Sequence, residues 1–339
     1  MAFGFILEVN GMHHNDNGQF GKIYFTKFQP INVPVMLILE ALGYEPITQN
    51  SIPKIKKNDL VFFTYSGPQF DWGTGWSANL FWECVNKKVR CVLVILHVHH
   101  LMGARLLEEE KVIFNAANYI IVLNDDMEDY FEKIGIKAKL VNMELFDFLA
   151  NDVVINDHQS CKKLRNQLVY AGGIEDEFRH SFFNDFPHTF SLDFFGLLNI
   201  KSPSNLISNS QYKGFFSNED LPTLLKGDFG LIWMDAALVS HTQFEKYWHI
   251  STSSKLPLYL ASGLPIICKK GTGDEKVVEK YQIGFAISSL EEIDERLLNI
   301  SEHQYQTFRN NVLELAQKTT EGYFLKRAVK FILDDIQHI

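Results

Sequence analysis

A lysine and a glycine-rich turn in the second half of the sequence have the residue types and spacing to hold a phosphate group. Lys255 lies at the start of an apolar helix pattern, and Gly271 and Gly273 form a turn that opens a further helix. Backbone N–H groups at a helix start attract anions, and a lysine ammonium adds a charge-assisted hydrogen bond. A diphosphate would fit at such a site. The alternative is that Lys255 is solvated and that the glycines only form a turn.

A polar loop at residues 10–19 contains candidates for acid–base chemistry. It follows the first apolar run of the chain and includes His14, Asp16, Asn17 and Gly18. Transfer of a group to an acceptor hydroxyl needs a base that removes the hydroxyl proton as the oxygen attacks, and Asp16 or His14 could be that base. Asn17 and Gly18 are candidates for contacts with the substrate. The alternative is a solvated turn in which Asp16 hydrogen-bonds its own backbone.

A histidine cluster follows the apolar run at 91–96. His97 and His99 are expected to lie on one face of the strand, a spacing that also suits a metal ion. A binuclear metallohydrolase would need carboxylates close behind, and residues 101–104 supply none, so this hypothesis is the weaker one. The sequence also lacks the motifs of P-loop nucleotidases and serine hydrolases, and no dinucleotide-binding motif follows the first apolar run.

Short apolar runs bounded by turn residues alternate with helix patterns along the chain. Runs without period-two alternation are typical of strands covered on both faces, as in a parallel sheet. Strands that alternate with helices predict a doubly wound α/β domain, in which ligands bind at the carboxyl ends of the strands. Asn124 is expected to cap the helix that follows it. The expected strands are 3–7, 60–64, 91–96, 119–123, 139–141, 168–171, 189–194, 229–233, 265–268 and 284–287, and the expected helices are 34–42, 77–86, 106–115, 125–134, 177–183, 218–225, 254–261, 274–281, 290–299, 302–316 and 322–336.

A polar stretch at 151–167 separates two such patterns and is expected to be a linker between domains. The length of 339 residues is enough for two domains. We expect one domain over 1–155 and a second over 165–318, followed by a closing segment over 319–339. Two facing domains of this kind leave a cleft between their strand ends, which suits a transferase with two substrates.

The composition narrows the class of protein further. Hydrophobic residues make up 46% of the chain and aromatic residues 13%, which provides enough apolar surface for two cores. A formal charge of −9 disfavours a nucleic-acid partner, and the apolar content makes a homo-oligomer conceivable. The four cysteines form no C-x-x-C pair and are expected to be reduced. No signal peptide or transmembrane segment is evident, so we expect a cytoplasmic protein.

Three blocks in the second half resemble a known family. They are GDFGLIWMD from Gly227, K-x-x-x-Y-L-A-S-G-L-P-I-I from Lys255 and GTGDEKVVEKYQIGF from Gly271. All three are similar to the C-terminal domain of bacterial GT-B glycosyltransferases, in particular the glucosyltransferases that extend sugars on serine-rich adhesins and the related galactofuranosyltransferases. The tail around Gly322 resembles that family's final helix. The resemblance implies two Rossmann-like domains that face a cleft, with a C-terminal helix that crosses back to the first domain.

The resemblance also implies a reaction and a set of site residues. The expected reaction moves a glucosyl or galactofuranosyl group from a UDP-sugar to a hydroxyl of a bacterial surface glycan, glycoprotein or lipid-linked sugar, with inversion and without a metal or other cofactor. The first domain would then hold the acceptor and the second the UDP-sugar. For Phe215, which precedes Phe216 in the chain, core packing against the next helix is at least as strong a hypothesis as a contact with the uracil. The residues that match the family's donor site are Gly172 and Gly173 at the nucleotide, Phe216 at the uracil, His97 at the sugar, and Lys255, Gly271, Thr272, Gly273, Asp274 and Glu275 at the diphosphate.

Two departures from the family pattern keep a second function open. Val98 stands where the family has an aspartate after the histidine, and Phe216 stands where it often has a tyrosine. A chain that has lost such contacts could be a catalytically silent partner that binds a sugar or nucleotide and assists another transferase. The hypothesis of a transferase and that of a silent partner differ in one observable, which is turnover of a UDP-sugar.

Overall fold

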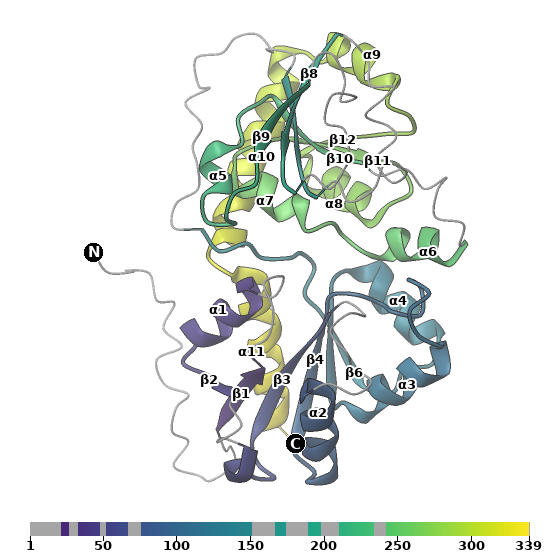
Figure 1. The fold of residues 1–339 in the computed structure, drawn as a ribbon, viewed down its shortest axis with the longest axis vertical. Helices are drawn as coiled ribbons and strands as arrows, with labels where there is room; N and C mark the ends of the chain where they lie inside the picture. Colours follow the sequence, from purple (N-terminus) through teal and green to yellow (C-terminus); the bar gives the residue numbers. More distant parts are fainter. Residues whose placement is uncertain are drawn as a thin grey trace.

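The computed structural model describes residues 22–26, 33–47, 52–66, 76–150, 167–173, 189–197, 210–233 and 242–338. Figure 1 shows two lobes stacked along the longest axis of the molecule, with the last helix beside the lower lobe. We call the lobe built on the first sheet the N-lobe and the lobe built on the second sheet the C-lobe. The expected strand at 3–7, the expected helix at 177–183 and nearly all of the expected linker lie outside the described residues.

The N-lobe is built on a six-stranded parallel sheet with the order β2-β1-β3-β4-β5-β6. Its central strands are buried almost throughout, because helices cover both faces of the sheet, and they are therefore apolar rather than alternating. The strands are β1 (Ile23–Thr26), β2 (Glu45–Ile47), β3 (Leu60–Tyr65), β4 (Arg90–Ile95), β5 (Tyr119–Val122) and β6 (Lys139–Asn142), and the helices are α1 (Val33–Ala41), the 3₁₀ turn η2 (Ile52–Lys54), α2 (Trp76–Asn86), α3 (Leu107–Ala116) and α4 (Asp125–Lys133).

The C-lobe repeats the plan with a second six-stranded parallel sheet in the order β12-β11-β10-β7-β8-β9. In each sheet the chain adds strands first towards one edge and then towards the other. In folds of this kind ligands bind at the loops that follow the carboxyl ends of the strands, near the point where the order changes. The strands are β7 (Gln167–Ala171), β8 (Ser191–Phe195), β9 (Ser210–Gly214), β10 (Phe229–Ile232), β11 (Ile266–Lys269) and β12 (Gly284–Ile287), and the helices are α5 (Leu221–Leu224), α6 (Thr242–Ile250), α7 (Lys255–Ala261), α8 (Gly273–Tyr281), α9 (Glu292–Asn299), α10 (Glu302–Thr320) and α11 (Tyr323–Gln337).

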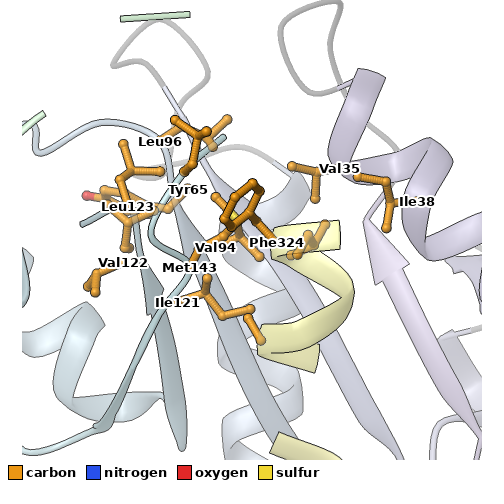
Figure 2. Close-up of a cluster of buried hydrophobic side chains, with 14 of the residues drawn as sticks. Val35, Ile38, Tyr65, Val94, Leu96, Ile121, Val122, Leu123, Met143 and Phe324 are labelled. Carbon is orange, nitrogen blue, oxygen red and sulfur yellow. The ribbon is translucent and has the colours of Figure 1, made fainter. Parts of the chain in front are cut away.

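The last helix, α11, returns to the N-lobe and completes its core. Phe324 enters the same buried cluster as Ile38 of α1 and Val94 of β4 (Figure 2). The carboxylate of Asp147 accepts the N–H groups of Phe324 at 3.2 Å and Leu325 at 2.7 Å, which satisfies two amides that a helix start leaves without intrahelical partners. The crossing of the C-terminal helix, expected from the resemblance, is confirmed.

Some elements have no sequence signal strong enough to reveal them. Among the described residues, the elements that were not predicted are β1, β2, β9, α6 and the 3₁₀ turn η2. Strand β9 is an edge strand with mostly exposed polar side chains, so it lacks the apolar run that marks the other strands. The helix expected over 218–225 is shorter in the structure, where only α5 forms. Pro222 lies in its first turn and has no N–H group, so it cannot donate the backbone hydrogen bond that a helix beginning earlier would need.

Two further expectations concern the cysteines and membrane-spanning segments. Cys84, Cys91 and Cys268 are free and buried, as expected, while Cys161 lies outside the described residues. Within the part of the chain that the structure describes, no helix has both the length and the apolar character that crossing a membrane requires.

A carboxylate on the loop after β6 ties the two lobes together. Glu144 accepts hydrogen bonds from Lys280 Nζ at 2.5 Å and from the Tyr281 hydroxyl at 2.6 Å, both at the end of α8. It also pairs with Arg327 of α11 at 2.8 Å. Burial raises the pKa of Glu144, but these hydrogen bonds outweigh burial and bring it down to about 2. The orientation of α8 relative to the N-lobe therefore depends on this residue.

We expect Glu144→Gln to lower the free energy of unfolding by about 1–3 kcal/mol at neutral pH, because it removes a charge that three donors share. The folded-state pKa is below the ordinary value of 4.5, so the stabilisation is complete above pH 4.5 and is lost as the pH falls from 4.5 towards 2. Urea unfolding of wild type and variant at pH 7 and at pH 3 measures both effects.

The matched control for this change is Glu83→Gln, which removes an exposed pair with Lys87 one helical turn away. We expect its effect to stay below about 0.5 kcal/mol, since exposed pairs contribute little. Equal effects of the two variants at pH 7, or a difference between wild type and Glu144→Gln that does not shrink in acid, would contradict the role assigned to Glu144.

Candidate functional site

Glycines line the carboxyl edge of the C-lobe sheet where β7, β8 and β9 end. The N–H of Gly172 donates to the Phe195 carbonyl at 2.7 Å, and the N–H of Gly196 donates to the Gly214 carbonyl at 2.9 Å. A Cβ on Gly196 would lie 2.1 Å from the Gly172 carbonyl oxygen, so only glycine allows these backbones to approach so closely. Exposed Gly173 follows directly. The edge is thus formed by backbone groups rather than by side chains.

The side chain of Lys255 lies against this glycine edge. Lys255 is the first residue of α7, and its Cε is 2.7 Å from the position that a Cβ on Gly172 would take. Its ammonium is 5.2 Å from the ring centroid of Tyr170, which is within the range of a cation–π contact. The structure therefore brings together Lys255 and Gly172, two residues that are 83 positions apart and were assigned separately to the donor site.

The turn before α8 provides backbone donors at the same end of the lobe. Gly271 has φ 78°, and its N–H donates to the Glu275 carboxylate at 2.7 Å, so this amide is already bonded within the protein. The Thr272 hydroxyl donates to the Lys269 carbonyl at 2.8 Å. The amides of Gly273 and Asp274 are the first two of α8 and have no acceptor within the helix. These two amides are the groups that could receive an anion.

The carboxylate of Asp274 faces the segment before α7. Its Oδ1 accepts the N–H of Ser253 at 2.8 Å, and the residue is only 5% exposed. Burial raises the pKa of Asp274 to about 6, although the Ser253 amide and the charge of Lys255 act in the opposite direction. The side chain of Asp274 therefore orients the turn that carries Lys255, and only its backbone amide is available to an anion.

The two phenylalanines after β9 occupy different environments. Phe216 is partly buried, with its ring centroid 6.1 Å from that of Phe195 and its ring against Gly214. Phe215 is 65% exposed. The expectation that Phe215 packs in the core is therefore wrong, because the chain turns outward after Gly214 and places the second ring, rather than the first, against β8.

His97 faces the C-lobe across the gap between the two sheets. Its Nδ1 lies 2.6 Å from the hydroxyl of Tyr247 in α6. Burial, with a smaller effect of His99, lowers the pKa of His97 to about 4, so the imidazole is neutral at neutral pH. Tyr247 was not among the predicted site residues, because nothing in the sequence links it to a histidine 150 positions earlier.

The expected pairing of His97 with His99 on one strand face is wrong. Strand β4 ends at Ile95 and a turn begins at residue 99, so the two histidines do not lie on a strand and their side chains do not follow its two-residue alternation. The Nε2 of His99 lies 2.6 Å from the Ser66 carbonyl oxygen, inside the N-lobe. No group of three or more His, Cys, Asp or Glu side chains suited to a metal ion occurs among the described residues. The metallohydrolase hypothesis therefore loses the geometry on which it depended.

A buried glutamate that the sequence analysis missed holds this turn. Glu110 is fully buried and accepts the N–H groups of His99 and His100, each at 2.8 Å. The Nδ1 of His100 lies 2.5 Å from the same carboxylate. Glu110 is one of three consecutive glutamates in α3, and the sequence alone does not tell which of them points inward.

The predicted acid–base residues His14 and Asp16, and the predicted substrate contacts Asn17 and Gly18, lie outside the described residues. Their roles stay predictions.

Two doubly wound lobes and a last helix that returns to the first lobe define a GT-B fold. Solved structures agree with this fold. HepE from Anabaena in complex with UDP-glucose superposes with a TM-score of 0.59 at 12% identity, over 92% of this chain and 99% of that one. Sucrose-phosphate synthase from Thermosynechococcus elongatus gives a TM-score of 0.60 at 12% identity, over 92% and 98%. The expected GT-B fold is confirmed.

The chain belongs to the glucosyltransferase 3-like family, whose N-terminal domain model matches residues 37–145 and whose C-terminal domain model matches residues 168–332. Glucosyltransferase 3 of Streptococcus gordonii is 26% identical over 239 residues, which is 69% of this chain and 66%, just under two thirds, of that protein. The β-1,6-galactofuranosyltransferase WbbI of Escherichia coli K12 is 25% identical over 273 residues, or 77% and 78%. The resemblance to both groups is thereby confirmed.

Proposed function

We propose that this protein transfers a hexosyl group, glucosyl or galactofuranosyl, from a UDP-sugar to a hydroxyl of a bacterial surface glycan or glycoprotein. The observation that carries the proposal is the position of the Lys255 ammonium, which lies against the glycine edge of the C-lobe. The hydrogen bond from the Ser253 N–H to the Asp274 carboxylate links the segment before Lys255 to the start of α8. A cation whose charge acts on the first residues of α8, together with the helix-start amides there, suits a diphosphate. Membership of the glucosyltransferase 3-like family supports the same donor class.

In this reaction the acceptor oxygen forms a bond to the anomeric carbon while the bond from that carbon to the phosphate oxygen breaks. The electron pair of the broken bond leaves with UDP, and the acceptor proton passes to a base, for which Asp16 and His14 are the candidates. Lys255 and the amides of Gly273 and Asp274 would stabilise the charge that develops on the leaving diphosphate. We propose inversion at the anomeric carbon and no metal requirement, because neutralisation of the diphosphate is assigned to the protein's own groups.

The neutral His97 fits a contact with the sugar rather than with the diphosphate. A neutral imidazole donates one hydrogen bond and accepts another, which suits a hydroxyl group. Phe216, Gly172 and Gly173 would border the nucleotide at the carboxyl ends of β7 and β9.

The test is release of UDP from a panel of UDP-sugars, including UDP-glucose and UDP-galactofuranose, with and without a glycan acceptor. We expect acceptor-dependent release with one donor, at an unchanged rate after treatment with EDTA, and an inverted anomeric configuration in the NMR spectrum of the product. Binding of UDP without turnover of any donor would instead favour the catalytically silent partner. If no uridine ligand binds, both functions fail.

A further inference from the structure

A side-chain amide of the N-lobe is buried without a hydrogen-bond partner next to the start of α8. Asn124 follows β5 and caps α4, as expected, with its Oδ1 accepting the N–H of Met127 at 2.9 Å. The residue is only 8% exposed, and its Nδ2 has no hydrogen-bond partner among the residues that the structure describes. Buried amide groups are nearly always paired in folded proteins, so an unpaired one needs an explanation.

The unpaired Nδ2 faces the first residue of α8. It lies 3.3 Å from the position that a Cβ on Gly273 would take, and the Ser251 carbonyl oxygen lies 2.3 Å from the same position. The next residue, Thr252, has a buried hydroxyl that is likewise without a partner in the described part of the chain. Two polar groups, one from each lobe, are thus unsatisfied near one helix start.

The unpaired donors select the chemistry of the missing partner. The first turns of α4 and α8 meet here, since Asp126 of α4 forms an ion pair with Lys276 of α8. Acidic side chains already balance the partial positive charge of these helix starts, Asp125 and Asp126 in α4 and Asp274 and Glu275 in α8, so the nature of the missing partner follows from the hydrogen-bond donors that face it. The Nδ2 of Asn124 can only donate, and so can the backbone amides of Gly273 and Asp274. The group that satisfies all of them is an anion with several acceptor oxygens.

We propose that Asn124 Nδ2 donates a hydrogen bond to the diphosphate of the nucleotide sugar, so that the N-lobe supplies part of the phosphate site. This inference rests on the proposed function, since it names a further contact for the same donor. The contact would make donor binding depend on the arrangement of the two lobes, because Asn124 belongs to the N-lobe and Lys255 to the C-lobe. The sequence analysis gave Asn124 only a capping role.

The test compares UDP with uridine by isothermal titration calorimetry. Asn124→Ser keeps a side chain that caps a helix well but removes the amide, and Asn124→Asp keeps the capping oxygen but replaces the amide by a carboxylate. We expect the affinity for UDP to fall about 10-fold or more in Asn124→Ser and further in Asn124→Asp, which adds charge repulsion. The affinity for uridine should not change, since uridine has no phosphate.

Asn115 of α3 provides matched controls. Its Oδ1 accepts the N–H of Lys137 at 2.7 Å, so Asn115→Ser and Asn115→Asp make the same chemical changes in the same lobe away from α8. We expect both to bind UDP as wild type does, and thermal melting of all four variants confirms folding. Wild-type affinity for UDP in Asn124→Ser, or an equal loss for UDP and uridine, would overturn the inference. Failure of the wild-type protein itself to bind UDP would instead reject the proposed function.

Discussion

We expect Lys255→Met to lower turnover of the UDP-sugar roughly 30- to 1,000-fold, which corresponds to a loss of about 2–4 kcal/mol in transition-state stabilisation. In the proposed reaction the ammonium would stabilise the leaving diphosphate, where negative charge grows as the glycosidic bond breaks. Methionine retains an unbranched stem that packs against Gly172 and Tyr170, so the fold should be preserved. Steady-state kinetics with the preferred donor measures the effect, and most of it should appear in kcat.

The control for this variant is Lys270→Met. Lys270 lies in the turn after β11, has an exposed side chain and carries the same charge. Its loss changes the net charge of the protein by the same amount, so we expect its turnover to stay within about 2-fold of wild type. If the two variants behave alike, or if Lys255→Met retains full turnover, Lys255 does not stabilise the leaving group.

Gly273→Ala should reduce kcat/KM about 100-fold and also destabilise the protein. The added Cβ would lie 2.3 Å from the Ser251 carbonyl oxygen, and backbone cannot yield as a flexible side chain does. The start of α8 must therefore move away from the segment that leads to Lys255. A displacement of about 1 Å is enough to cost about 100-fold in rate, and overpacking of this kind costs about 1–3 kcal/mol in stability. Kinetics and thermal melting give the two quantities.

Gly135→Ala separates the effect on the site from the effect on stability. Gly135 has φ 82° and open space where its Cβ would be, so alanine there costs about 1–2 kcal/mol of backbone strain and no steric clash. We expect a similar loss of stability with unchanged kcat/KM. Full activity in Gly273→Ala would show that the start of α8 does not need its position against Ser251.

The parts of the fold that sequence patterns predict are those with strong local signals. The runs at 60–64 and 91–96 form β3 and β4 because strands covered on both faces need apolar side chains throughout. The turn at Gly271 and the helix start at Gly273 are also local, and both form as expected. The exposed edge strand β9 lacks such a signal.

Contacts between the lobes could not be predicted in the same way. His97 meets Tyr247 across 150 positions, and the amide of Asn124 meets Gly273 across 149. Periodicity reports only which side of an element is buried, and it does not indicate which residue of another lobe lies opposite. Asn124 illustrates the limit, because its capping oxygen follows from the local pattern while its unpaired amide depends on the placement of α8.

The return of α11 to the N-lobe has a consequence for how the chain acquires its structure during synthesis. Phe324, Ile332 and Ile336 belong to the same buried cluster as Ile38 and Val94, so a segment that is synthesised after the whole C-lobe fills part of the core of the N-lobe. Until then the surface that α11 covers is open to water. Folding of the first half therefore finishes only after the second half has been made, and such long-range contacts are typically slow to form.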